Sequence, residues 1–391
     1  LKGNEEFVMI DDQKLAYETA LGMARKSYRD GKKRVLIVKG GPGTGKSVLA
    51  INLLVKLTSE NMVCSYTTKN AAPRNVYATK LSGDFRKTRI NNLFKSSGSF
   101  VRIPENEIDV LIADEAHRLN AKSGMCQNLG ENQIKEIIKA SKFSVFFIDE
   151  SQRVTLKDIG SVEEIKKYIE QANAESEIME LESQFRCNGS DGYIAWLDDV
   201  LDIRKTANGE GFDLDYDIKI CDTPNEIRDI IFEKNKINNK ARLLAGYCWN
   251  WIKDGKNKSD VFDITIPEYD FAMSWNLNNS KTWAIDPDSV NEVGCIHTCQ
   301  GLEFDYVGVI IGDDLRYEDG KIVTDVTKRA KTDQSIRGIH KLEKQDLNKA
   351  QKIADEIIKN TYRTLMSRGQ KGCYIYCVDK ALANYLRERI N

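Results

Sequence analysis

A glycine-rich segment in the first part of the chain has the residue types that bind the phosphates of a nucleotide. Residues 40–47 read GGPGTGKS and match the pattern G-x-x-x-x-G-K-[ST] in full, between an apolar run and a helical pattern. Glycines let backbone N–H groups face phosphate oxygens, the lysine adds a positive charge, and the final hydroxyl is a ligand for Mg²⁺. We therefore expect nucleotide contacts from Gly41, Pro42, Gly43, Thr44, Gly45, Lys46 and Ser47.

Two adjacent carboxylates follow a second apolar run. Asp114 and Glu115 come directly after residues 110–113, at the end of a predicted strand. Asp114 is suited to hold hydrated Mg²⁺, and Glu115 to orient and deprotonate an attacking water. The pair favours hydrolysis over transfer of a phosphoryl group to a second substrate, which would not need an activated water. Two roles stay open for His117: coupling this site to another one, or capping the next turn.

Three further residues have the chemistry to sense or stabilise a transferred phosphoryl group. Gln152 follows the next predicted strand, where an uncharged amide can report hydrolysis; an ordinary polar strand end is the alternative. Arg186 and Arg368 lie near element ends in the second half of the chain. A guanidinium supplied from a second domain stabilises transition-state charge, although each arginine taken singly also fits a surface salt bridge. Arg363 lies close enough to Arg368 in sequence to share such an interface.

The elements that must position these residues alternate between strands and helices. The first half predicts buried strands at residues 35–39, 63–67, 110–113 and 145–149. Helices are predicted between them, at residues 47–58, 70–81, 132–140 and 162–172. This alternation implies an α/β fold with a parallel sheet covered on both faces, and with ligands at the carboxyl ends of the strands.

The second half of the chain is less regular. Helices are predicted at residues 191–201 and 224–234, and strands at residues 241–247, 293–298, 307–311 and 374–378. A charged stretch from about residue 316 to 358 has helical composition, which predicts an insertion on the surface of a second α/β domain. A length of 391 residues suggests two domains, and we place them at residues 1–180 and 181–391.

Composition limits the class of protein without naming it. The formal net charge is −1, so no general basic excess indicates nucleic-acid binding, and a locally basic groove would have to suffice. The nine cysteines form no CxxC pair, which favours buried reduced thiols over a metal site or a disulfide framework. No apolar stretch reaches membrane-spanning length and no signal peptide is visible, so we expect no membrane partner and a cytoplasmic location.

Basic and aromatic residues gather after the second predicted strand. They are Lys69, Arg74, Tyr77, Lys80, Arg86, Lys87 and Arg89. Such side chains can neutralise nucleic-acid phosphates and stack on a base, but solvated helices carry lysine and arginine equally often. For Trp249, Trp251 and Trp275 we expect packing in the core or at a domain interface rather than base stacking.

The order of these motifs is similar to that of superfamily 1 DNA/RNA helicases. HTCQGLEFD at residues 297–305 looks like motif V, and the series from the glycine loop through DEAH, D-x-x-Q, Q-F-R and S-R-G-Q-K-G resembles the rest of motifs I to VI. Four longer segments resemble, more narrowly, a bacterial DEAH-box P-loop helicase domain related to the Schlafen C-terminal domain: GGPGTGKSVLAINLL, QFRCNGSDGYIAWL, AGYCWNW and NTYRTLMSRGQKGCYIY. The match runs from about residue 10 to the end.

This resemblance implies two RecA-like parallel-sheet domains of the P-loop NTPase class that close on ATP and Mg²⁺ and drive motion along DNA or RNA. It implies catalysis by Lys46, Glu115, Gln152, Arg186 and Arg368. Gln13 would read the adenine, and Glu303 would contact the nucleotide. Nucleic-acid contacts are implied for Thr67, Thr68, Lys69, Asn70 and Gln300, and we add Arg74 from the basic cluster.

As partners we expect single-stranded or partly duplex nucleic acid, with DNA preferred to RNA. A fused or associated nuclease or other effector is also expected, and the start at Leu1 leaves room for such a domain. A P-loop ATPase switch that hydrolyses ATP without translocating is the main alternative. A nucleotide kinase conflicts with the acidic pair and with the later motifs.

Overall fold

The chain folds into two compact units in the computed structural model. The structure describes Met9 and residues 11–81, 86–124, 128–182, 191–206, 216–252, 261–276 and 282–390. The first unit comprises Leu1–Lys69, Leu81–Glu150 and Asp158–Gln184. The second comprises Asn70–Lys80, Ser151–Lys157 and Phe185–Asn391. Two short segments, residues 70–80 and 151–157, therefore pack with the second unit, although each begins within three residues of the end of a strand of the first.

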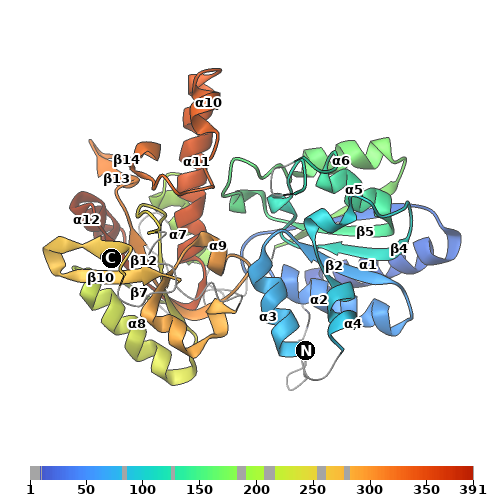
Figure 1. Ribbon diagram of the computed structural model, residues 1–391, viewed down its shortest axis with the longest axis horizontal. Helices are drawn as coiled ribbons and strands as arrows, with labels where there is room; N and C mark the ends of the chain where they lie inside the picture. Colours follow the sequence, from blue (N-terminus) through green and yellow to red (C-terminus); the bar gives the residue numbers. More distant parts are fainter. Residues whose placement is uncertain are drawn as a thin grey trace. The chain divides into compact units, whose positions relative to one another are not determined.

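The first unit is built on one parallel sheet (Figure 1). Its elements are α1 (Asp11–Asp30), β1 (Arg34–Gly40), α2 (Lys46–Ser59), β2 (Cys64–Thr68), α4 (Lys87–Leu93), β3 (Phe94–Ser96), β4 (Ile108–Ala113), α5 (Gln133–Ala140), β5 (Ser141–Ile148), α6 (Val162–Gln171) and β6 (Glu175–Leu181). The strand order is β3-β2-β4-β5-β1-β6, and every pairing is parallel. The glycine loop and the acidic pair follow β1 and β4, at the same edge of the sheet.

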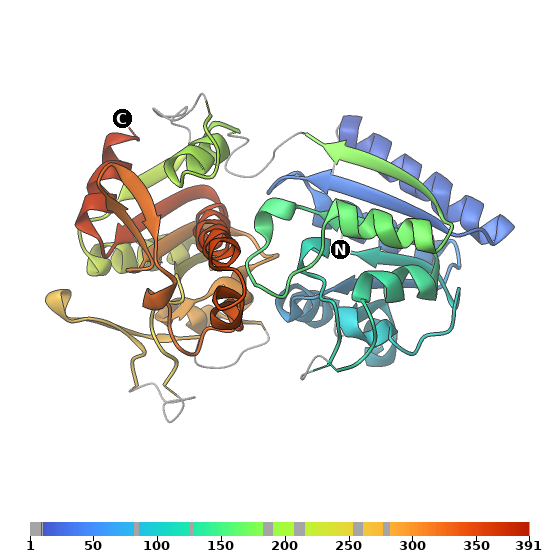
Figure 2. The same cartoon turned by 90° about the horizontal axis from the view of Figure 1, so that it is seen from above.

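Helices cover both faces of this sheet, because its strands are apolar on both sides. Val35 and Ile37 of β1 pack with α5 and α6 in one hydrophobic cluster, while α1 and α2 lie on the opposite face (Figures 1 and 2). Leu36 and Val38, the alternate residues of β1, are equally buried. A strand that is buried on both faces reads as a continuous apolar run, which is why the sequence predicts β1 well.

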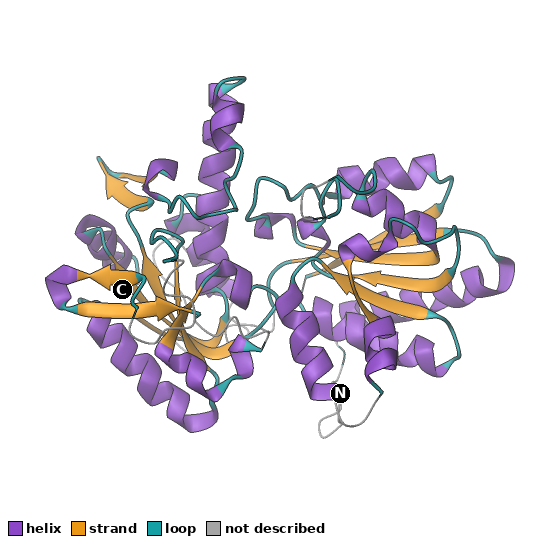
Figure 3. Ribbon diagram, in the orientation of Figure 1, coloured by secondary structure: helices purple, strands orange, loops and turns teal. Residues whose placement is uncertain are grey.

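The second unit contains a seven-stranded sheet of order β7-β15-β12-β8-β11-β10-β9 (Figure 3). Within this sheet, only the β10–β9 pairing is antiparallel among the strand pairs that the structure describes. The elements are α3 (Ala71–Leu81), α7 (Asp191–Val200), β7 (Asp217–Ile220), α8 (Pro224–Asn238), β8 (Ala241–Ala245), β9 (Ile264–Ile266), β10 (Phe271–Trp275), β11 (Glu292–Gly294), α9 (Ile296–Cys299), β12 (Phe304–Ile311), β13 (Leu315–Glu318), β14 (Lys321–Thr324), α10 (Ile339–Glu343), α11 (Leu347–Met366), β15 (Gly369–Cys377) and α12 (Lys380–Glu388).

Two hydrophobic clusters fill the faces of the second sheet. Helices α7, α11 and α12 pack on one face with Val307 and Val309 of β12, and α8 packs on the other with Ile310. Trp275 is buried in this second cluster, with Trp249 and Trp251 against it, so the prediction of core packing for the three tryptophans is confirmed. Both units are RecA-like α/β domains, and the predicted fold class is confirmed.

Two expectations about the second half are wrong in part. The strand predicted at residues 293–298 ends at Gly294, and Ile296–Cys299 forms the short helix α9. The charged stretch that begins at residue 316 does not start as a helix, because residues 315–324 form the antiparallel hairpin β13–β14. No helix in the described part of the chain is long and apolar enough to cross a membrane. The seven cysteines that the structure describes form no disulfide, and six of them are buried.

Candidate functional site

The glycine loop joins the end of β1 to the start of α2 and has the backbone that phosphate binding requires. Gly43 and Gly45 have φ angles of +80° and +81°, in the left-handed region that costs other residues free energy. Gly45 is also the N-cap residue of α2, so the backbone N–H groups of the first helical turn face the loop. Gly41, Pro42, Gly43, Thr44 and Gly45 thus lie together in one tight turn before the N-terminus of α2.

Two side chains fasten the loop from within the first unit. The ammonium of Lys46 donates to the carbonyl oxygens of Gly40 (2.7 Å) and Gly41 (2.5 Å), and only 6% of the residue is exposed. From α1, the buried amide nitrogen of Gln13 donates to the carbonyl oxygen of Thr44 at 2.9 Å. The amide oxygen of Gln13 is also buried and has no hydrogen-bond partner within the described ranges. Gln13 therefore offers an acceptor beside the phosphate loop; whether it reads adenine remains a prediction.

Asp114 and Ser47 form the oxygen pair that the sequence assigns to Mg²⁺. Asp114 directly follows β4, accepts a hydrogen bond from the Tyr66 hydroxyl at 2.7 Å and is hydrogen-bonded to Ser47. Burial and then the neighbouring charge of Glu115 raise the pKa of Asp114, whereas the two hydroxyl hydrogen bonds lower it. Mg²⁺ binds through one or two protein oxygens together with water and phosphate oxygens. The hydroxyl and the carboxylate therefore fit this cation, and a divalent charge would offset the cost of the buried carboxylate.

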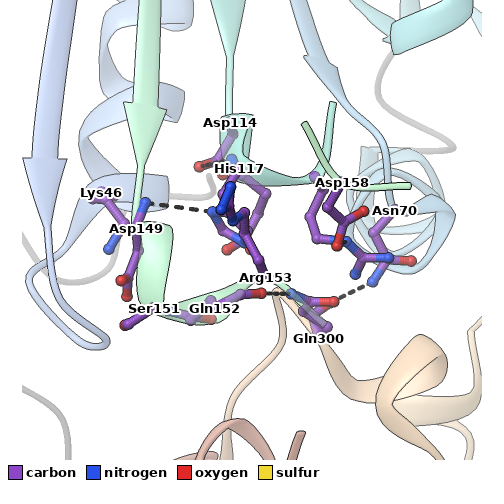
Figure 4. Close-up of polar contacts among 12 residues, drawn as sticks. Lys46, Asn70, Asp114, His117, Asp149, Ser151, Gln152, Arg153, Asp158 and Gln300 are labelled. Carbon is purple, nitrogen blue, oxygen red and sulfur yellow. Dashed lines mark hydrogen bonds and ion pairs between the residues drawn. The ribbon is translucent and has the colours of Figure 1, made fainter. Parts of the chain in front are cut away.

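Glu115 and His117 form a pair that extends to the next strand. The backbone of Glu115 has a φ of +53°, which turns the chain sharply after β4. The Nε2 atom of His117 lies 3.0 Å from the Glu115 carboxylate. Its Nδ1 atom accepts from the backbone N–H of Asp149, after β5, at 3.4 Å (Figure 4). His117 thus contacts both the turn after β4 and the end of β5.

The turn that carries this pair is supported by a segment that sequence reasoning missed. Arg118 forms an ion pair with Asp158 at 2.9 Å, and the backbone N–H of Ile159 donates to the carbonyl oxygen of Leu119. A Cβ atom on Gly160 would lie 1.9 Å from the carbonyl oxygen of Ala116. Only glycine allows this approach of two backbones. The contact joins positions more than 40 residues apart, so no local pattern signals it.

In the second unit, residues from four motifs form one hydrogen-bonded chain. Gln152 ends a short 3₁₀ helix, Glu150–Gln152, and its side-chain oxygen accepts from Arg368 Nη2 at 2.8 Å. Its backbone oxygen accepts from the side-chain amide of Gln300 at 3.2 Å. The backbone oxygen of Gln300 in turn accepts from the Asn70 side chain at 2.7 Å (Figure 4). Gln152, Gln300 and Arg368 are almost completely buried, so the chain is shielded from water.

Helix α11 holds the segment that carries Gln152. Asn360 donates to the backbone oxygen of Arg153 at 3.1 Å, and Arg363 donates to the Ser151 hydroxyl at 3.1 Å. The guanidinium of Arg363 also pairs with Asp198 of α7, and both side chains are buried. The sequence places Arg363 beside Arg368 as a residue of interest. Asn360 begins a segment that resembles the helicase family, but the resemblance assigns no role to it or to Asp198.

The other predicted site residues have varied surroundings. Thr67 and Thr68 are buried in β2, and their hydroxyls have no hydrogen-bond partner among the residues that the structure describes. Arg74, in α3, donates to the backbone oxygen of Asn70 at 3.4 Å. Glu303 is exposed and accepts from Gln370 at 2.6 Å. Lys69 ends the first segment of the first unit. Arg186 lies outside the described residues.

Comparison with known proteins identifies the family of this chain. A model of the Schlafen group 3 DNA/RNA helicase domain matches residues 33–379. An uncharacterized protein of Saccharomyces cerevisiae, YPL245W, is 24% identical over 91% of this chain and 83% of its own length.

Among solved structures, the similarities are low. The Pif1 helicase from Candida albicans is 15% identical with a TM-score of 0.32, and the alignment covers 59% of this chain and 56% of that one. The SWI2/SNF2 ATPase core of Sulfolobus solfataricus, solved with double-stranded DNA, is 10% identical with a TM-score of 0.30 and coverage of 95% and 88%. TM-scores of this size support no inference about function. The family model, by contrast, spans most of the sequence. This chain therefore belongs to the Schlafen group 3 DNA/RNA helicase domain family and is a helicase-like P-loop NTPase.

Proposed function

We propose that this chain is an ATP-dependent motor of superfamily 1 that couples ATP hydrolysis to movement along nucleic acid, with DNA preferred to RNA. The observation that carries the proposal is the position of Gln300. Its side chain binds the backbone of Gln152, and its own backbone binds Asn70. A residue suited to report hydrolysis is thus two hydrogen bonds away from a residue assigned to nucleic-acid binding.

The first unit would bind and hydrolyse the nucleotide. The glycine loop would cradle the phosphates with backbone N–H groups, and Lys46 would exchange its loop carbonyl partners for phosphate oxygens. Ser47 and Asp114 would hold Mg²⁺, which supplies charge neutralisation at the phosphates when bound. Glu115 would take a proton from the attacking water, while the N–H of His117 keeps its carboxylate oriented.

The second unit would supply the cationic side chains and the coupling. We assign to Arg368 and Arg186 the stabilisation of charge on the transferred phosphoryl group, because a guanidinium stays charged and matches phosphate geometry. Arg368 already donates a hydrogen bond to the amide oxygen of Gln152. A movement of either side chain would therefore alter the position of the other. Gln300 and Asn70 would pass that change on to the bound strand, together with Thr67, Thr68, Lys69 and Arg74.

ATP turnover measured with and without added strands tests this proposal. We expect single-stranded DNA to stimulate turnover many-fold and single-stranded RNA to stimulate it less. Lys46→Ala and Glu115→Gln should abolish turnover under all conditions. Turnover that no strand changes would favour an ATPase switch without a nucleic-acid track.

The role of Gln300 has its own test. Gln300→Met keeps the volume of a fully buried side chain but removes the amide that binds Gln152. We expect this variant to retain basal turnover and to lose most of the stimulation by DNA. Gln171→Met, at an exposed position at the end of α6, is the matched control and should behave like the wild type. Full stimulation of the Gln300→Met variant would exclude coupling through this side chain.

A further inference from the structure

A projecting part of the second unit carries an unusual concentration of positive charge. We call residues 328–352 the basic arm; it follows the hairpin β13–β14 and contains α10 and the first turns of α11. Figures 1 and 3 show α10 and this end of α11 extending beyond the sheet of their unit. The arm belongs to the charged stretch that the motifs of the helicase family do not account for.

Exposed cations far outnumber exposed carboxylates on the basic arm. The seven exposed lysine and arginine residues are Lys328, Lys331, Arg337, Lys341, Lys344, Lys349 and Lys352. Of the three acidic residues in the same range, Asp333 is buried, which leaves Glu343 and Asp346 near the surface. The whole chain has a net charge of −1, so this excess is local and not a property of the composition.

In the described part of the chain, these cations have no carboxylate partners. Elsewhere lysines pair closely with acids, as Lys371 does with Asp305 at 2.7 Å and Lys219 with Glu226 at 2.6 Å. Within the described residues, no ion pair joins any of the seven exposed cations of the arm to a carboxylate. Asp346 is already used as the N-cap of α11, and Glu343 as the partner of His340. The positive charge therefore remains available to an anion from outside the chain.

The arm is nevertheless a fixed scaffold. Arg329, which is almost completely buried, lies between Asp314 (3.0 Å) and Asp333 (2.7 Å). Ile339 and Ala350 form a small apolar cluster at its base. Lysines on an ordered helix lose less backbone entropy on binding than lysines on a loop. The entropic cost of binding a ligand is therefore smaller.

The inner end of the arm is attached to the segment that carries Gln152. The backbone N–H of Leu156 donates to the carbonyl oxygen of Ser335 at 2.8 Å, and Leu156 packs against the same apolar cluster as Ile339. A ligand bound along the arm would therefore be held by the same structural unit as the residue proposed to sense hydrolysis.

The side chains of the arm favour phosphate over other anionic surfaces. Lysine is depleted at protein–protein interfaces, where aromatic residues and arginine dominate, and the arm offers six exposed lysines and no aromatic side chain. Leu347 is its single large apolar residue with high exposure, so a membrane surface would gain little anchoring. Lysine ammonium groups along a helix suit a regularly charged polymer, since they bind phosphates as point charges without reading bases.

We propose that the basic arm is a second nucleic-acid contact, which grips the phosphate backbone irrespective of base sequence and lies outside the residues assigned to the motor. The inference rests on the proposed function, because it takes the ligand to be the nucleic acid on which the chain acts. It adds a binding surface that the helicase motifs do not contain.

Binding of fluorescein-labelled strands, measured by anisotropy without nucleotide at several salt concentrations, tests the arm. The test variant changes Lys341, Lys344, Lys349 and Lys352 to Gln. Log affinity falls as log salt rises, and each lost phosphate contact reduces the absolute value of this slope by about 0.9 for duplex DNA and about 0.7 for single strands. For four lost contacts, we expect the absolute value of the slope to fall by up to about 3.6 for duplex DNA and about 2.8 for single strands. The affinity at low salt should fall roughly tenfold or more.

A matched control changes four exposed lysines of the first unit to Gln: Lys26, Lys122, Lys139 and Lys166. This variant should keep the wild-type slope, and both variants should keep the basal ATP turnover of the wild type. If the arm variant keeps the wild-type slope and its strand-stimulated turnover, the proposal for the basic arm is wrong, while the proposed motor function is unaffected. The proposal for the basic arm is also wrong if the arm variant loses binding to anionic phospholipid vesicles or polyglutamate but keeps its affinity for strands. A wild-type chain that binds no strand at all overturns the proposed function first.

Discussion

Gly160→Ala tests how tightly the turn after β4 is held in the geometry described above. The added Cβ atom would lie 1.9 Å from the carbonyl oxygen of Ala116 and 2.7 Å from the Cα atom of His117, whereas ordinary contacts begin near 3.4 Å. Both neighbours are backbone atoms, which cannot rotate away as a side chain can. One of the two segments must therefore move by roughly 1 Å or more.

This displacement has two measurable consequences. Overpacking of this kind costs about 1–3 kcal/mol of folding free energy, which thermal and urea denaturation detect. The moving turn also carries the Glu115–His117 pair, and a misplacement of about 1 Å can reduce a catalytic rate by roughly 100-fold. We expect ATP turnover of the Gly160→Ala variant to fall by about that factor at temperatures where the variant remains folded.

Gly22→Ala is a control that should change the folding stability in the opposite direction. Gly22 lies inside α1 of the same unit, and no atom lies within 4 Å of the Cβ position there. Alanine replaces glycine in a helix with a gain of about 0.5–1 kcal/mol, so this variant should be more stable than the wild type and equally active. If Gly160→Ala were as stable and as active as the wild type, the reasoning from this contact would be refuted.

Three further predictions concern other parts of the chain. Arg368→Ala should leave nucleotide binding nearly unchanged but lower turnover by about 1,000-fold or more, as fluorescent-nucleotide titration and steady-state kinetics would show; normal turnover would exclude the arginine assignment. The hydrogen bond from Arg25 lowers the pKa of Glu60 to about 2, so the pair's contribution of about 0.2–1 kcal/mol is present above pH 4.5 and lost toward pH 2. Glu60→Gln should therefore lower the melting temperature at pH 7 and not near pH 2; an equal difference at both would contradict the assignment. Asp314→Ala removes one of the two carboxylates beside the buried Arg329 and should cost about 3–5 kcal/mol in urea denaturation, whereas a cost below about 1 kcal/mol would contradict it.

The sequence predicts the part of the fold in which local pattern and burial agree. β1, β4, β5 and β12 are apolar on both faces and read as strands without help from other elements. The glycine loop and the acidic pair then follow directly, because each is defined by residues adjacent in sequence to a predicted strand.

Elements with weaker apolar signals were missed. Helix α1 packs through Ala16, Ala20 and Ala24, small residues that give little hydrophobic contrast. β6 lies at the edge of its sheet and is mostly exposed, so its four polar and charged positions hide the strand. The hairpin β13–β14 did carry a signal: Asp319 and Gly320 form the Asp-Gly turn with positive φ angles that favours tight hairpins, but the surrounding charge obscured it.

For residues that are far apart in the sequence, the motifs could be predicted but the contacts between them could not. Gln152 and Arg368 lie 216 positions apart, and each has a recognisable local sequence, but the hydrogen bond between them depends on the tertiary fold. Of the supporting residues, Gly160 lies in no recognisable motif, and Asn360 begins a segment that resembles the helicase family but receives no role from it. Their structural role depends on contacts made in the folded chain: Asn360 binds the backbone of Arg153, and Gly160 lies against the backbone of Ala116.

The most direct test of motor activity is displacement of streptavidin from the biotinylated end of a single-stranded DNA. A chain that moves along the strand should strip the streptavidin in the presence of ATP and Mg²⁺, and the Lys46→Ala variant should not. Displacement should also be lost with the Gln300→Met variant, in which turnover continues without coupling. Strand-stimulated ATP turnover with no displacement from either end of the strand would contradict the account and indicate an ATPase that senses nucleic acid without travelling along it.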